Sequence, residues 1–244
     1  MSEKTTPVAR GAAKAPAERK SEKSAIDAFV RQARALAPAG GAGGRLILAL
    51  DATMSRQPTW DLACALQGEM FDAVAKAGSL SVQLVYYRGL SDCRASRFVN
   101  DTEALKGLME RIDCRGGHTQ IGKVLSHALK EHARGKVNAL VFIGDAMEES
   151  VDDLADRAGR LGLVGLPVFL FQEGNDSAVE RTFKELARLS RGAWFRFDRG
   201  AAEALARLLS AVAVFASGGL TALEARGRPE DRLLLSHLSG GHGR

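Results

Sequence analysis

The sequence predicts an α/β fold of the Rossmann-like, doubly wound type: a mostly parallel central sheet with one short antiparallel edge strand and helices on both faces. Short apolar runs alternate along the chain with longer stretches in which apolar residues recur every three or four positions. This is the pattern of strands alternating with helices. Three of the runs, 46–50, 139–143 and 166–171, contain no polar residue, as is typical of strands covered on both faces.

Six segments are predicted to be strands, and six others have the spacing of amphipathic helices. The predicted strands are 45–50, 81–87, 96–99 (the short edge strand), 139–144, 166–171 and 193–197. The predicted helices cover the apolar positions within 62–74, 105–112, 121–129, 151–161, 179–187 and 205–212. In sheets of this kind ligands bind at the carboxyl ends of the strands, so we expect the functional residues there.

The chain divides into a folded domain over 45–220 and two flanking segments. Residues 1–44 are predicted to form a disordered basic tail, a short helix over 27–36 and a glycine-rich linker. Residues 221–244 are predicted to be a loose tail with one amphipathic turn around Leu233 to Leu238.

The net charge of +5 lies in these flanking segments, because residues 25–225 contain 24 basic and 24 acidic residues. A neutral domain argues against a nucleic-acid partner.

Cysteine usage and hydropathy favour a cytoplasmic protein. The three cysteines (Cys64, Cys93 and Cys114) are far apart and odd in number, which fits neither a disulfide framework nor a metal knuckle. No apolar segment typical of a secretory signal stands near the N-terminus. The longest uncharged stretch, 208–223, contains serines and glycines and is too short to span a membrane.

A glycine-rich segment before the 121–129 helix suggests a nucleotide site at first sight. Gly117, Gly122 and Lys123 have the spacing G-x-x-x-x-G-K of a phosphate-binding loop. However, Val124 stands where that motif needs a hydroxyl for magnesium, and the preceding residues have the pattern of a helix and a loop rather than a buried strand. We therefore predict a solvated Lys123 and no nucleotide site.

Oxygen-bearing side chains instead collect at the predicted strand ends. Asp51 directly follows the first strand, with Thr53 and Ser55 two and four residues later. Asp145 follows the 139–144 strand, and Thr119 lies in the glycine-rich turn. Carboxylates and hydroxyls are hard ligands of the kind that Mg²⁺ or Mn²⁺ prefers.

This order of motifs resembles the metal-ion-dependent adhesion site of the von Willebrand factor A (VWA) domain family. The resemblance covers most of 45–215 and is closest to the stand-alone, intracellular bacterial members. It implies that Asp51, Thr53 and Ser55 form the first metal loop, Thr119 the second and Asp145 the third. One position departs from the family pattern, because Thr53 stands where a serine is usual. Threonine keeps the oxygen and stiffens the rotamer.

The resemblance implies a protein-interaction module rather than an enzyme. Mg²⁺ (or Mn²⁺) keeps water on the positions that the protein leaves open, and in this family an aspartate or glutamate of a partner protein takes one of them. Family analogy points to an ATPase or a chaperone-type assembly as the partner. Two alternatives stay open: a metal-dependent phosphohydrolase with Asp51 as nucleophile, although its motif requires an aspartate at the position of Thr53, and a metal-independent VWA scaffold.

The residues next to these positions have simpler interpretations. We expect His118 to be a solvent-facing or hydrogen-bonding residue. Glu148 and Glu149 could support the metal ligands from outside or favour the N-terminus of the helix that follows them, and we prefer the second interpretation. Trp60 and Trp194 are predicted to pack in the core or at its rim.

Overall fold

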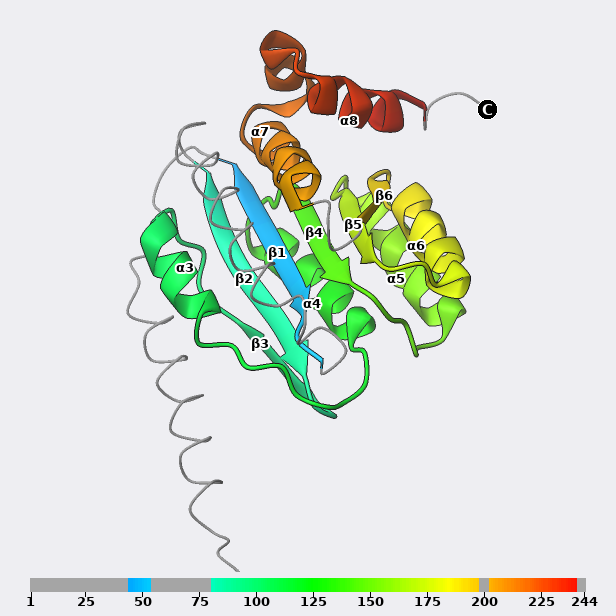
Figure 1. Ribbon diagram of the computed structural model, residues 1–244. Coiled ribbons are helices and arrows are strands. Elements are labelled where there is room, and N and C mark those ends of the chain that lie inside the picture. The colour runs from blue at the N-terminus through cyan, green and yellow to red at the C-terminus, as the bar shows by residue number, and fades with distance from the viewer. Residues whose placement is uncertain (1–43, 54–79, 198–201, 241–244) are drawn as a thin grey trace, which may run out of the picture.

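The computed structural model describes residues 44–53, 80–197 and 202–240 of the chain (Figure 1). Its strands are β1 (Arg45–Asp51), β2 (Ser81–Arg88), β3 (Asp92–Ala95), β4 (Ala139–Gly144), β5 (Val168–Glu173) and β6 (Ala193–Phe197). Its helices are α3 (Thr102–Met109), α4 (Ile121–Arg134), α5 (Val151–Leu163), α6 (Ser177–Leu189), α7 (Ala202–Arg226) and α8 (Pro229–Gly240). The predicted helices over 27–36 and 62–74 lie outside the described residues.

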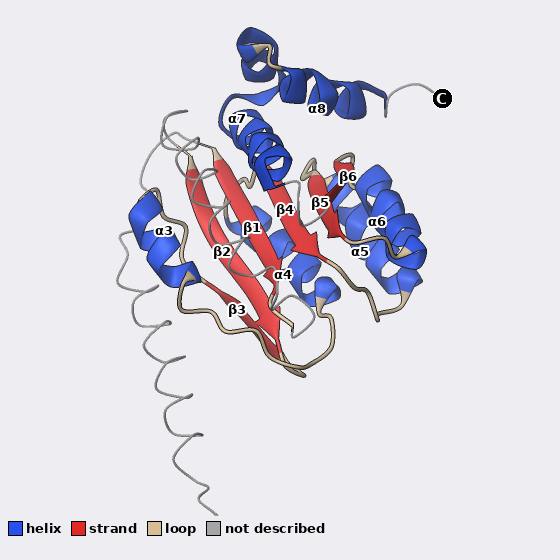
Figure 2. Ribbon diagram, in the orientation of Figure 1, coloured by secondary structure: helices blue, strands red, loops and turns tan. Residues whose placement is uncertain are grey.

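The strands form one sheet in the order β3-β2-β1-β4-β5-β6. Every neighbouring pair is parallel except β2 and β3, which are antiparallel. Helices lie on both sides of this sheet (Figure 2). The predicted fold class is therefore confirmed.

The two faces of the sheet are separated by the alternation of side chains along each strand. Leu46, Leu48 and Leu50 of β1 belong to a core cluster that α3, α7 and α8 cover. Ile47 and Ala49 belong to the opposite cluster, under α4, α5 and α6. Because both faces of β1 are buried, polar side chains are confined to its ends, where Asp51 stands.

The antiparallel edge strand lies four residues earlier than the sequence predicts, at 92–95 instead of 96–99. The Ser96 hydroxyl accepts the N–H of Leu84 at 3.0 Å, so a side chain satisfies β2 where a strand would continue. Val99 makes only an isolated bridge to Val82 and is buried in the core. The apolar character of this segment therefore reflects a core contact.

Strand β5 begins two residues later than the 166–171 prediction. Proline has no N–H to donate to a sheet, and Pro167 contributes only its carbonyl, which accepts the N–H of Leu140 at 3.0 Å. Regular pairing starts at Val168.

The described part of the C-terminal segment, 221–240, is mostly helical, which corrects the prediction of a loose tail there. Helix α7 bends at Gly219, whose φ of 69° glycine adopts easily, and α8 packs on α7 and β6. Asp231 is fully buried there. It accepts hydrogen bonds from Arg226 Nε at 2.7 Å and from the backbone N–H of Arg228 at 3.0 Å. The boundaries 1–44, 45–220 and 221–244 stay predictions.

No helix in the described ranges combines the length and apolar character needed to cross a membrane.

Candidate metal centre

Two of the predicted carboxylates meet at the carboxyl edge of the sheet. Strands β1 and β4 are paired neighbours, with Leu50 opposite Ile143, so Asp51 and Asp145 end adjacent strands. Gly144 makes this approach close: a β-carbon there would lie 3.4 Å from Cβ of Asp51 and 2.9 Å from the Phe142 ring. The two acidic side chains therefore share one small region, as the sequence predicts.

Asp51 is a fully buried carboxylate held by neutral donors. Its Oδ1 accepts the N–H of Thr53 at 2.8 Å, and its Oδ2 accepts the hydroxyl of Tyr87 at 2.9 Å. Burial raises the pKa of Asp51, and the charge of Asp145 adds to this, while the hydrogen bonds from Thr53 and Tyr87 lower it. Such a carboxylate would be stabilised by a nearby cation.

Tyr87 is a residue of this centre that the sequence analysis missed. It is fully buried in β2, opposite Asp51 in the strand register. Burial raises its pKa well above the ordinary value, as does the charge of Asp51. The sequence signal for Tyr87 was weak, because it stands at the end of an apolar strand segment, where an aromatic residue usually packs in the core.

One carboxylate oxygen of Asp145 lacks a hydrogen-bond partner. Among the described residues, its Oδ1 is the single buried side-chain oxygen or nitrogen without a hydrogen-bond partner. Leaving such an atom unpaired is costly, and a bound ion is one of the few explanations for it in a native structure.

The turn that carries Thr119 is tied to the end of β1. The N–H of Arg115 donates to the Ala52 carbonyl at 3.0 Å, and Arg115 bridges to Thr53. Gly117 lies so close to Gly89 that a β-carbon would come within 2.1 Å of the Gly89 carbonyl oxygen. Thr53 and Thr119 are each 6% exposed, so both hydroxyls belong to the interior of this edge. Ser55 lies outside the described residues.

Glu148 and Glu149 contact the Thr119 turn, which is the less favoured of the two roles considered for them. The N–H of Thr119 donates to Glu148 Oε2 at 2.9 Å, and the Thr119 hydroxyl donates to Glu149 Oε2 at 2.7 Å. Helix α5, which follows them, is capped by Ser150 instead. Glu149 supports the preceding helix, because its Oε1 accepts the N–H of Gly122 at 2.8 Å.

A sequence signal for this role existed at the start of α4. Its N-cap residue, Gln120, makes no side-chain capping bond, although helix starts need acceptors for their free N–H groups. An uncapped helix start predicts an acceptor from elsewhere in the chain, but not which one.

The structure confirms the expected surroundings of Lys123, His118 and Trp194, while Trp60 lies outside the described residues. Lys123 is exposed and binds Gln120 Oε1 at 2.8 Å, and its turn follows α3 and a loop rather than a strand. His118 is exposed and lies 3.0 Å from Glu148 Oε2. Trp194 is half-buried at the rim and donates to Gln172 Oε1 at 3.1 Å.

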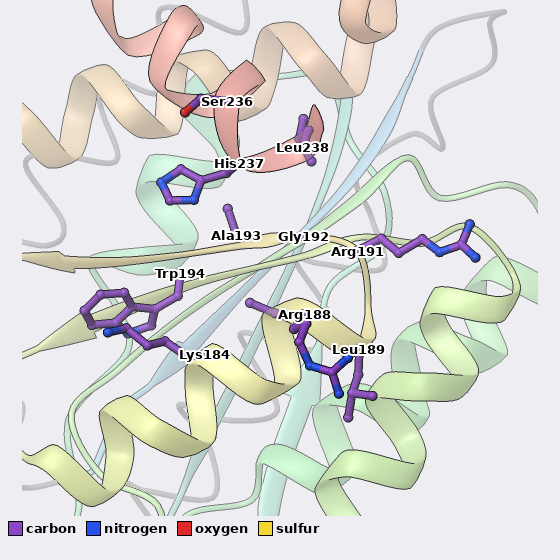
Figure 3. A pocket seen from close by; sticks show the side chains of 11 residues that line it. Lys184, Arg188, Leu189, Arg191, Gly192, Ala193, Trp194, Ser236, His237 and Leu238 are labelled. Carbon is purple, nitrogen blue, oxygen red and sulfur yellow. The ribbon is translucent and has the colours of Figure 1, made fainter. Parts of the chain in front are cut away.

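A pocket of about 620 Å³ lies elsewhere, between α6, β6 and α8 (Figure 3). Two of its cations pair within their own helix: Lys184 pairs with Glu180 and Arg188 with Glu185, each at 2.6 Å. None of the predicted metal ligands that the structure describes lines it. We therefore assign the chemistry to the carboxyl edge of the sheet.

The donors at that edge suit a small, hard divalent cation. Within the described ranges, no three His, Cys, Asp or Glu side chains are grouped to hold a metal by themselves. A cation would thus depend on the Asp51 and Asp145 carboxylates together with hydroxyls, a set that favours Mg²⁺ or Mn²⁺ over softer metals. The unpaired Oδ1 of Asp145 and the buried Asp51 fit such an ion.

Comparison with known proteins identifies the fold. No family model matches the sequence, and no curated protein does. Solved structures do match. The SpRpn10 VWA domain is 11% identical over 65% of this chain and 89% of its own, with a TM-score of 0.55. The vWF domain of the type V pili tip protein Mfa5 from Porphyromonas gingivalis is 11% identical over 73% and 98%, with a TM-score of 0.55.

A von Willebrand factor type A protein from Catenulispora acidiphila is 16% identical over 71% of this chain and 43% of its own, with a TM-score of 0.56. At these identities the comparison concerns the fold. The chain has the fold of a von Willebrand factor type A domain.

Proposed function

We propose that this protein is a metal-dependent protein-interaction module. Asp51, Thr53, Ser55, Thr119 and Asp145 would hold Mg²⁺ or Mn²⁺ at the carboxyl edge of the sheet. The observation that carries the proposal is the buried, unpaired Oδ1 of Asp145 beside the buried Asp51 carboxylate. A buried Asp51 carboxylate beside the half-buried Asp145 is unfavourable, and a divalent ion would relieve both the repulsion and the missing contact of Asp145 Oδ1.

The ion would supply a Lewis-acidic binding point for an acidic side chain. The residues of the chain would orient it: the N–H of Thr53 and the hydroxyl of Tyr87 fix the Asp51 carboxylate, and the short turn at Gly117 fixes Thr119. A glutamate or aspartate of a partner protein would replace a water on the ion. The adhesive function in the names of similar structures, such as the pilus adhesin SpaC from Lactobacillus rhamnosus, supports binding over catalysis.

The proposal is tested by partner capture in Mg²⁺ and in chelator. We expect wild-type protein to retain a partner in Mg²⁺ and to release it in chelator, and Asp51→Ala to retain none. Glu185→Ala, which removes a surface carboxylate of α6 far along the chain from the metal loops, is the matched control and should behave as wild type.

Two other outcomes would contradict the proposal. Capture that persists in chelator and in Asp51→Ala would indicate a metal-independent scaffold. Turnover of a phosphoester that disappears in Asp51→Asn would indicate a phosphohydrolase.

A further inference from the structure

The hydroxyl of Thr119 has most of its hydrogen-bonding capacity committed. It donates its proton to Glu149 Oε2 at 2.7 Å and accepts the backbone N–H of Glu148 at 2.9 Å. A threonine hydroxyl has one proton and two lone pairs. Hence one lone pair remains for a further contact.

The direction of the bond to Glu149 decides whether that lone pair exists. An ionised carboxylate can only accept hydrogen bonds, so the Thr119 hydroxyl must be the donor in its bond to Glu149. A neighbour that donated to Thr119 would occupy the second lone pair and turn the proton toward any cation. An acceptor at this position is thus compatible with metal ligation by Thr119, and a donor is not.

Glu149 is itself held in place. Its second oxygen, Oε1, accepts the N–H of Gly122 at 2.8 Å. The Gly122 carbonyl in turn accepts Nη1 of Arg157 at 2.9 Å. Arg157 of α5 therefore contacts the same first turn of α4 that holds Glu149. The N–H of Gly122 fixes the Glu149 carboxylate relative to α4.

We propose that Glu149 is a positioning residue of the metal centre. By accepting the hydrogen bond from the Thr119 hydroxyl, it keeps one lone pair of that oxygen free for the ion. The inference rests on the proposed metal site. The inference extends the proposed site by assigning control of metal affinity to a residue outside the five ligand positions. Groups that orient a ligand in this way commonly change metal affinity tenfold to a hundredfold.

The test compares two substitutions that remove the same charge. Glu149→Gln introduces an amide that can donate to Thr119, whereas Glu148→Gln removes a neighbouring carboxylate that accepts the Thr119 backbone N–H and not its hydroxyl. Mg²⁺ is titrated calorimetrically into each variant and into wild type, and the melting temperature of each metal-free protein is recorded. We expect Glu149→Gln to raise Kd about tenfold or more and Glu148→Gln to raise it less than threefold.

A conservative variant separates positioning from a loss of folding. Glu149→Asp keeps a side chain that only accepts, so it should retain Mg²⁺ more tightly than Glu149→Gln despite its shorter reach. Equal Kd values for Glu149→Gln and Glu148→Gln, or weaker binding by Glu149→Asp than by Glu149→Gln, would overturn the inference. Absence of Mg²⁺ binding by wild type would instead refute the metal site itself.

Discussion

Asp51 and Asp231 are both fully buried carboxylates, but their surroundings differ. Asp231 faces a cation: Nε and Nη2 of Arg226 bind its two oxygens, and the N–H of Arg228 adds a third contact. Among the described residues, the donors that reach Asp51 are neutral, and the charge that raises its pKa is that of another acid, Asp145. Asp231 is thus paired with a cation, whereas the described neighbours of Asp51 are neutral or acidic.

In our proposal, this difference separates a structural role of Asp231 from a functional role of Asp51. Arg226 also donates to Ser210 Oγ at 2.9 Å, so the Asp231 pair links α7 to the start of α8. At the sheet edge, Gly144 and the Gly117 turn hold two acids and a hydroxyl near one another without compensating them. A fold keeps such an unfavourable arrangement where a ligand supplies what is missing.

The largest expected effect on stability is at the compensated site. Asp231→Ala leaves the guanidinium of Arg226 without its buried partner, which costs about 3 to 5 kcal/mol of unfolding free energy. Urea unfolding followed by circular dichroism measures the loss. Metal affinity should not change in the fraction that stays folded. A variant as stable as wild type would show that the connection between α7 and α8 does not depend on the Asp231–Arg226 pair.

A smaller loss is expected when Tyr87 loses its hydroxyl. Tyr87→Phe removes the donor to Asp51 Oδ2 and leaves that buried oxygen with one contact fewer, which costs about 1 kcal/mol. Because the lost hydrogen bond lowers the pKa of Asp51, the substitution should raise that pKa and weaken Mg²⁺ binding at acidic pH. Urea unfolding and metal titration at pH 5 and 8 test both effects, and stronger Mg²⁺ binding in the variant would contradict them.

The pH dependence of the unfolding free energy tests the raised pKa of Asp51. Burial raises the pKa of Asp51 in the folded protein above its ordinary value of 3.8. The protonated acid therefore stabilises the fold fully below the unfolded pKa, and this contribution is lost as pH rises through the folded pKa.

The matched control for this effect is Asp51→Asn. The unfolding free energy of metal-free wild type, minus that of the variant, should fall as pH rises through that window and then level off. Urea unfolding across pH 3 to 8 gives this difference. A difference that rises with pH would mean that Asp51 is stabilised as an anion without metal.

Much of the fold was predictable from local patterns, because both faces of the central strands are buried. The predicted bounds of 139–144 and 193–197 match β4 and β6. The edge strand was predicted at the wrong residues because the apolar Val99 packs in the core and makes only an isolated bridge to the sheet. Helix α8 was missed because its attachment depends on the tertiary pair of Asp231 with Arg226, which no local pattern contains.

The positions of Asp51 and Asp145 were predictable because strand ends determine them. These residues end neighbouring strands, and the Thr119 turn is recognised by its glycines. Tyr87 was missed, and the contact of Glu149 with Thr119 was only the less favoured of two roles considered for it. The contacts of these two residues with Asp51 and Thr119 depend on strand register and on a turn 30 residues away, and neither is visible in a single sequence.

We propose that Asp51 and Asp145, at the carboxyl edge of the sheet, hold a divalent cation. Calorimetric titration of Mg²⁺ into metal-free wild type and into Asp51→Asn tests this proposal, with the surface variant Glu185→Ala as control. We expect one saturable site in wild type and in Glu185→Ala, and none in Asp51→Asn. No saturable binding to wild type, or equal binding to Asp51→Asn, would contradict it.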